Sequence, residues 1–228
     1  MLKVLSTKIL DEKLIATARD MGMSLDCVEV IGTRTLDFDR SALQSDTYDA
    51  IVFTSSNAVK AFIPPLQRGS GGFDYSHTKV FALSGKTKDE LEKNGIAPVG
   101  VADNAEQLGD KIIAEGTIRS VLNICGNLRL DALEKKLTAA GISYKELVVY
   151  ETIALDNRVD ASYDAVMFYS PSGVESFSTK NKLNQRTLYC CIGEMTAGKL
   201  KSIDGNVNIV VAKEPRPEAM LTTIKEFK

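Results

Sequence analysis

Residues 48–62 read YDAIVFTSSNAVKAF, and residues 163–177 read YDAVMFYSPSGVESF. The two stretches start 115 positions apart and share seven of fifteen residues. In each, an apolar run leads into small polar residues and then into apolar positions at helical spacing. A repeat of this length predicts duplicated domains rather than a solenoid, whose repeats are roughly 20 to 50 residues long. We therefore expect two related halves that face each other across a cleft.

The segments around this repeat also occur twice, in the same order. Short apolar runs predict buried strands, and apolar residues at helical spacing predict the helices between them. The first copy predicts a strand at 3–6, a helix at 9–21 that ends at Gly22, and a strand at 25–31. The second copy predicts the same elements over residues 120–153. A third pair, at 80–85 and 188–193, predicts a strand that enters a polar helix through a glycine.

Strands that alternate with helices predict parallel sheets with helices on both faces. The fold class is therefore α/β, with two similar flavodoxin-like domains. Ligands of such sheets bind beyond the carboxyl ends of the strands. Residues 54–57 and 170–173 would lie there, each at the junction of a strand and a helix.

The composition excludes several classes of function. The 228 residues carry 28 basic and 30 acidic side chains, mixed along the chain, which favours neither a nucleic-acid nor a membrane partner. His77 is the only histidine, and the four cysteines show no C-x-x-C spacing, so a first-row metal site would need an unusual ligand set. Cysteines in apolar contexts without a secretory leader favour a cytoplasmic protein.

The hydroxyl-rich junctions allow two interpretations. Ser56 or Asn57 would cap a helix, which needs no ligand and is worth about 1 kcal/mol. The second copy, however, places Ser170, Ser172 and Gly173 at the same kind of junction. Helix N-termini favour anions, so several in one cleft would hold a polycarboxylate without a cluster of Lys and Arg. Lys88 and Thr196 follow two further strand-to-helix turns.

Two other residues have both a functional and a structural interpretation. Arg129 would clamp a carboxylate, or pair with Asp131 or Glu134 on its own helix. Tyr150 ends an apolar strand, where it would donate a hydrogen bond or a proton into the cleft, or pack as a half-buried aromatic residue.

Five motifs resemble the uroporphyrinogen-III synthase family in content and order. Each is short, but together they follow one another at spacings like those of the family, and the resemblance extends from residue 4 to about residue 224. The motifs are FTSSNAV at 53–59, CGNLR at 125–129, VYET at 149–152, FYSPSGV at 168–174 and IGEMTA at 192–197.

This resemblance implies a lyase of tetrapyrrole and haem biosynthesis. Such an enzyme closes the linear tetrapyrrole hydroxymethylbilane to uroporphyrinogen III, with inversion of ring D and loss of water. It implies a cytoplasmic monomer that needs neither cofactor nor metal. The substrate carries eight carboxylates, which agrees with the anion site expected from the helix N-termini.

The resemblance also implies roles for individual residues. Tyr150 matches the family tyrosine that assists departure of the hydroxyl group. Thr196 matches the family threonine, whereas in the first copy Lys88 takes the place expected for a threonine and Thr87 comes one residue early. The residues implied to bind substrate are Ser55, Ser56, Asn57, Lys88, Asn127, Arg129, Ser170, Ser172, Gly173 and Thr196.

The family pattern further implies that the domains are not simple halves. One domain would comprise residues 1–34 with 154–228, and the other residues 36–150. Two linkers, at about 32–37 and 150–155, would form a two-stranded hinge.

Two rival functions remain open from the sequence. Two α/β domains with two crossovers also describe a non-catalytic, hinge-closing protein that binds small anions, or a synthase-like regulator. A flavodoxin-like nucleotide-binding enzyme is a further alternative, although the glycine spacings of phosphate loops and dinucleotide folds do not occur.

Overall fold

The computed structural model describes residues 1–38, 48–67, 78–128 and 131–228. Its two compact units are called here unit 1, Met1–Gly32 with Ile153–Lys228, and unit 2, Thr33–Thr152. The chain therefore passes from one unit to the other twice. His77 and the glycine-rich residues 69–72 lie outside the described residues.

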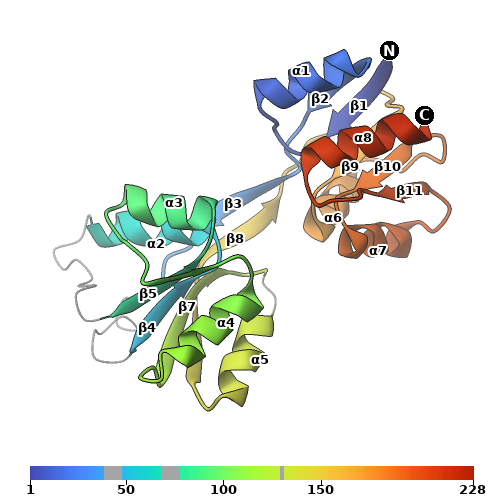
Figure 1. The fold of residues 1–228 in the computed structure, drawn as a ribbon. Helices are drawn as coiled ribbons and strands as arrows, with labels where there is room; N and C mark the ends of the chain where they lie inside the picture. Colours follow the sequence, from blue (N-terminus) through green and yellow to red (C-terminus); the bar gives the residue numbers. More distant parts are fainter. Residues whose placement is uncertain (39–47, 68–77, 129–130) are drawn as a thin grey trace. The chain divides into compact units, whose positions relative to one another are not determined.

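Unit 1 is a five-stranded sheet with helices on both faces (Figure 1). The strand order is β11-β10-β9-β1-β2, and every pairing is parallel. The strands are β1 (Leu2–Ser6), β2 (Met23–Cys27), β9 (Ala165–Phe168), β10 (Leu188–Cys191) and β11 (Asn208–Val211). Helices α1 (Glu12–Asp20) and α8 (Pro217–Phe227) cover one face, and α6 (Pro171–Lys180) and α7 (Glu194–Ile203) cover the other.

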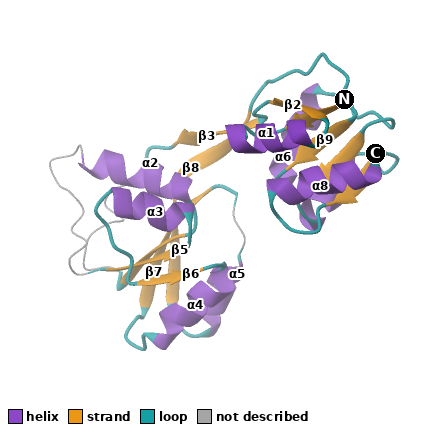
Figure 2. Ribbon diagram, turned by 45° about the horizontal axis from the view of Figure 1, so that its top comes forward, coloured by secondary structure: helices purple, strands orange, loops and turns teal. Residues whose placement is uncertain are grey.

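Unit 2 has a six-stranded sheet in the order β3-β8-β7-β4-β5-β6, again between two layers of helices (Figure 2). The strands are β3 (Ile31–Thr35), β4 (Ala50–Phe53), β5 (Lys79–Leu83), β6 (Gly100–Ala102), β7 (Ser120–Gly126) and β8 (Ser143–Ala154). Helices α2 (Ser56–Gln67) and α3 (Lys86–Lys93) cover one face, and α4 (Ala105–Ala114) and α5 (Ala132–Ala139) cover the other. The pairings from β8 to β6 are parallel.

The repeated sequence forms the buried centre of each sheet. Alternate side chains of β4 point to opposite faces, so that Phe53 packs with α2 and Val52 with α4 and α5. Strand β9 does the same, with Phe168 on one face and Met167 on the other. All eight residues of the two strands are buried. This double burial explains why the strands are continuous apolar runs rather than alternating ones.

The structure confirms the predicted α/β class but corrects two predicted boundaries. Helix α1 begins at Glu12 rather than at residue 9, because the Asp11 carboxylate accepts a hydrogen bond from the Leu14 amide at 2.8 Å. The predicted strand at 25–31 is two strands, since β2 ends at Cys27 and Ile31 begins β3, which pairs with β8. The predicted helix end is confirmed, with Gly22 at φ +82°.

The aspartate of the repeated Tyr-Asp-Ala has the same structural role in both copies. The Asp49 carboxylate accepts hydrogen bonds from the Arg119 amide at 2.7 Å and from the amide and hydroxyl of Ser120 at 2.9 and 3.1 Å. In the other copy, Asp164 accepts from the Lys3 amide at 2.8 Å. Each aspartate therefore ties the start of its own strand to the start of a neighbouring strand.

We predict that Asp49→Asn lowers stability in a pH-dependent way. The hydrogen bond from the Arg119 amide is the main cause that holds the pKa of Asp49 below its usual value. The stability that this gives is present above the unfolded pKa of about 3.9 and is lost as pH falls through the folded pKa. Because Asp49 is largely exposed, we expect a loss on the order of 1 kcal/mol at pH 7, seen as a lower Tm, that shrinks towards pH 3. Asp20→Asn, on the exposed end of α1, is the control, and an equal loss at both pH values would contradict the prediction.

Candidate functional site

Ser55 caps helix α2 at the carboxyl edge of unit 2, directly after β4. Its hydroxyl oxygen accepts a hydrogen bond from the Asn57 amide at 3.2 Å, and its carbonyl accepts from the Ala58 and Val59 amides. The capping residue is therefore Ser55, not Ser56 or Asn57 as the sequence suggested. Ser56 and Asn57 lie in the first turn of the helix and are partly exposed. The first turn of α2 thus presents backbone amides and polar side chains to this edge.

Tyr150 and Ser55, both singled out from the sequence, meet in the structure. The Tyr150 hydroxyl donates a hydrogen bond to the Ser55 hydroxyl oxygen at 3.1 Å. The tyrosine is 9% exposed, and its ring packs in the core beneath α2. The ring of Tyr150 is therefore a packed aromatic side chain that carries its hydroxyl to the carboxyl edge, and donation to a ligand stays a prediction. With two donors on Ser55 Oγ, the serine's own hydrogen can point to a ligand.

Gly126 makes room for the ring of Tyr150. A Cβ atom at position 126 would lie 2.4 Å from Cζ of Tyr150. The pairing of β7 with β8 also shifts register between Cys125 and Gly126, which places Gly126 opposite Tyr150. The glycine of the CGNLR motif is therefore required by the tyrosine of the VYET motif, a relation that sequence reasoning missed.

Asn127 fixes the chain beside Tyr150. Its backbone N–H donates a hydrogen bond to the Tyr150 carbonyl at 3.1 Å, and its side-chain oxygen accepts one from the Thr152 backbone N–H at 2.8 Å. The side chain therefore holds the end of β7 against β8, and only its NH₂ group can serve an anionic ligand. Arg129 lies outside the described residues.

Lys88 and Thr87 lie in the first turn of α3, which follows Gly85 at φ +66°. Thr87 is buried, whereas the partly exposed Lys88 forms an ion pair with Glu92 of the same helix at 3.2 Å. An exposed pair of this kind is worth little and exchanges readily for another carboxylate. Lys88 therefore places a cation in the first turn of α3, at the carboxyl end of β5.

In unit 1, Ser170 is the counterpart of Ser55 and caps helix α6. Its hydroxyl accepts a hydrogen bond from the Gly173 amide at 3.1 Å and lies 3.1 Å from the Ser172 hydroxyl. Gly173 is buried in the first turn. The structure therefore brings Ser170, Ser172 and Gly173 together around one helix N-terminus at the carboxyl edge.

Thr196 lies in the first turn of α7, the helix that follows β10. The side chain is 3% exposed, and the residue before the helix is Gly193, which offers no side-chain cap. Within unit 1, Thr196 thus shares the carboxyl edge with Ser170, since β10 and β9 are neighbours in the sheet.

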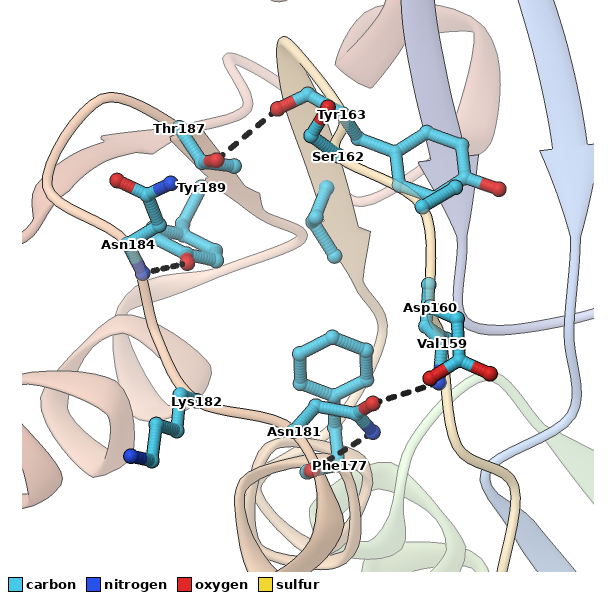
Figure 3. A pocket seen from close by; sticks show the side chains of 12 residues that line it. Val159, Asp160, Ser162, Tyr163, Phe177, Asn181, Lys182, Asn184, Thr187 and Tyr189 are labelled. Atoms are coloured by element: carbon cyan, nitrogen blue, oxygen red, sulfur yellow. Dashed lines mark hydrogen bonds between the residues drawn. The ribbon is translucent and has the colours of Figure 1, made fainter.

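A pocket of about 260 Å³ in unit 1 lies at the opposite edge, where β9 and β10 begin (Figure 3). Hydrogen bonds join polar groups that line it. Thr187 donates to the Tyr163 carbonyl at 2.9 Å, and the Asn184 amide donates to the Tyr189 hydroxyl at 2.7 Å. Several of its polar groups are therefore already paired within the chain, and none of the residues predicted for the site lines it.

The described residues contain no group of three or more His, Cys, Asp or Glu side chains that could hold a metal ion. Among the same residues, no helix combines the length and apolar character needed to cross a membrane.

A family model described as uroporphyrinogen-III synthase HemD matches residues 12–222. The match extends from α1 to α8 and includes all five motifs. The chain belongs to the uroporphyrinogen-III synthase family. This family member is therefore a lyase-type enzyme of haem biosynthesis.

Solved structures of uroporphyrinogen-III synthases share the fold of this family member. The enzyme from Helicobacter pylori aligns with a TM-score of 0.72 at 19% identity over 100% of both chains. A mutant form of the Thermus thermophilus enzyme aligns with a TM-score of 0.63 at 18% identity, over 99% of this chain and 98% of the other. The wild-type Thermus enzyme gives 0.51 at 19% identity, over 99% and 97%. At 18–19% sequence identity, these alignments show that the folds are similar.

We predict that Gly126→Ala destabilises this synthase family member. The added methyl group must displace the buried Tyr150 ring, so we expect a loss of about 1–3 kcal/mol in the free energy of unfolding, measured with urea. Gly198→Ala is a matched control, because Gly198 lies in helix α7 with open space around it and should gain up to about 1 kcal/mol. Equal stability of Gly126→Ala and the wild type would refute the close packing.

Proposed function

We propose that this chain acts as a uroporphyrinogen-III synthase through side chains at the carboxyl edges of its two sheets. Family membership over residues 12–222 supports the activity, and the hydrogen bond between Tyr150 and Ser55 supports the location. The reaction closes hydroxymethylbilane to uroporphyrinogen III, inverting ring D and releasing water. We propose that the enzyme works as a monomer without a cofactor or metal. Its four free cysteines suit a reducing cytoplasm, where we propose it acts.

The capped helices would bind the substrate's carboxylates. The first turns of α2 and α6 carry backbone amides whose partial positive charge favours an anion. Ser56, Asn57 and Ser172 would add hydrogen-bond donors at these turns, while Ser55 and Ser170 hold the turns in shape. Gly173 lets a ligand approach the backbone closely. Lys88, Asn127, Arg129 and Thr196 complete the proposed set of binding residues.

Binding of this kind suits the chemistry of the substrate. Loss of the terminal hydroxyl group leaves a reactive azafulvene, which cyclises without help to the wrong isomer. The enzyme therefore directs the reaction mainly by holding the linear tetrapyrrole in the geometry that leads to inversion of ring D. Neutral donors at helix ends also avoid placing many cations beside a positively charged intermediate.

Tyr150 would assist departure of the hydroxyl group. In the structure its proton is directed to Ser55, so the leaving oxygen would replace or join Ser55 as the acceptor. The carbon–oxygen bond would break as the pyrrole nitrogen's lone pair forms the new double bond, and the oxygen would take the Tyr150 proton and leave as water. Loss of the pyrrole N–H proton would then give the azafulvene and return a proton to the tyrosine. The ring is fixed in the core, which orients the phenol before the substrate arrives.

The proposed activity is tested with freshly prepared hydroxymethylbilane and chromatographic separation of the products. We expect uroporphyrinogen III in excess over the isomer I that forms spontaneously. If the protein yields only isomer I, the synthase proposal fails, and a binding protein or regulator would then account for the fold.

We predict that Tyr150→Phe lowers kcat by roughly tenfold and leaves the enzyme active. One hydrogen bond is worth about 1.4 kcal/mol at most here, and positioning by the other residues is retained. Tyr163→Phe, which removes a hydroxyl that bonds to Asp26 in unit 1 rather than to a proposed site residue, is the control and should leave kcat unchanged. Wild-type turnover of Tyr150→Phe would remove Tyr150 from the proposed role.

A further inference from the structure

The turn after β1 in unit 1 is a rigid support for an exposed lysine. Thr7 is buried, and its amide and hydroxyl both donate to the Met167 carbonyl, at 3.1 and 2.7 Å. The Ser6 hydroxyl donates to the Lys8 carbonyl at 2.6 Å and accepts from the Lys8 amide at 3.3 Å. The backbone of Lys8 is therefore fixed at the carboxyl edge, while its side chain is exposed.

The ring of Tyr169 positions the ammonium group of Lys8. Lys8 Nζ lies 5.9 Å from the centroid of this ring, within the range of a cation–π contact. The Tyr169 hydroxyl points away from solvent and lies 3.0 Å from Ser6 Oγ. Since the Ser6 hydrogen is directed to the Lys8 carbonyl, Tyr169 is the donor in this pair. Burial raises the pKa of Tyr169 far above its usual value, so the phenol stays neutral and serves as a support.

Lys8 pairs with none of the carboxylates in the part of the chain that the structure describes. Other lysines of unit 1 do form such pairs, for example Lys199 with Glu175 at 3.2 Å and Lys180 with Asp156 at 3.0 Å. Ser170, which caps α6, follows Tyr169 directly in the chain. The contact with Tyr169 places Lys8 near the N-terminus of α6, and a cation that pairs with no carboxylate of the described residues is suited there to an incoming one.

Two exposed apolar side chains follow the strands on either side of β9. Ile9 follows Lys8 and is 56% exposed, and Met195, at the start of α7, is 67% exposed. The two strands are β1 and β10, and β9 between them leads into Tyr169. Exposed apolar groups beside a cation fit a ligand that carries carboxylates on flat apolar rings.

We propose that Lys8 binds a side-chain carboxylate of the linear tetrapyrrole and that Tyr169 acts as the positioning residue for its ammonium group. The inference rests on the proposed function and adds a binding residue that the five sequence motifs do not contain. Lys8 acts on binding rather than on the chemical step, because a cation beside the departing hydroxyl would oppose the positive charge that develops.

The test measures KM and kcat for hydroxymethylbilane at low and high salt. We expect Lys8→Gln to raise KM roughly fivefold at low salt with little change in kcat. The effect is modest because an exposed ion pair contributes little binding free energy. The KM of the wild type should rise with salt more steeply than that of Lys8→Gln, because salt screens the lost charge. Lys8→Arg should restore KM. Lys13→Gln, on the exposed surface of α1, changes net charge equally and should behave like the wild type.

The role of the aromatic ring is tested separately. Tyr169→Phe keeps the ring and should keep the wild-type KM, whereas Tyr169→Leu should raise KM as Lys8→Gln does. If Lys8→Gln still forms uroporphyrinogen III and has the KM and salt dependence of the wild type, the inference is overturned. Formation of isomer I alone by the wild type would instead overturn the proposed function.

Discussion

The central strands of both sheets are covered by helices on both faces, and this constraint determines where polar chemistry can occur. Strands β4 and β9 are buried along their whole length, so neither can present a polar side chain midway. Each backbone must leave its sheet at the carboxyl end, where a helix begins and its first amides need partners. Ser55 and Ser170 supply those partners, and the same turns leave further amides for a ligand. The candidate site follows from the way these helices start.

Much of the fold could be predicted because its signals are local. Continuous apolar strands, helical spacing and glycines at helix ends predicted the α/β class, and the repeat identified β4 and β9 as equivalent. Of the two misplaced boundaries, one has a local cause and the other a cause distant in the chain. Asp11 caps α1 two residues after Ile9, and residues 31–35 pair with the distant β8 instead of extending β2. Apolar pattern alone does not distinguish which strand a segment joins.

The contacts of the candidate site could not be predicted in the same way. The hydrogen bond from Tyr150 to Ser55 joins residues 95 positions apart and depends on the register of β8, β7 and β4. A one-residue slip would turn Tyr150 to the other face of the sheet. Lys8 carried no signal in the sequence, since a single lysine after a short strand is common. Its position over Tyr169 depends on β1 and β9 being neighbours, although 158 residues separate them in the chain.

The close approach of Gly126 to Tyr150 also affects how the sequence can change. Because a side chain at position 126 and a large ring at position 150 claim the same space, the two positions form one packing unit although they lie in different motifs. A substitution at either position alone creates a clash or a void, whereas a larger residue at 126 combined with a smaller one at 150 conserves the volume. Attempts to redesign this edge of the sheet would therefore need to vary both positions together.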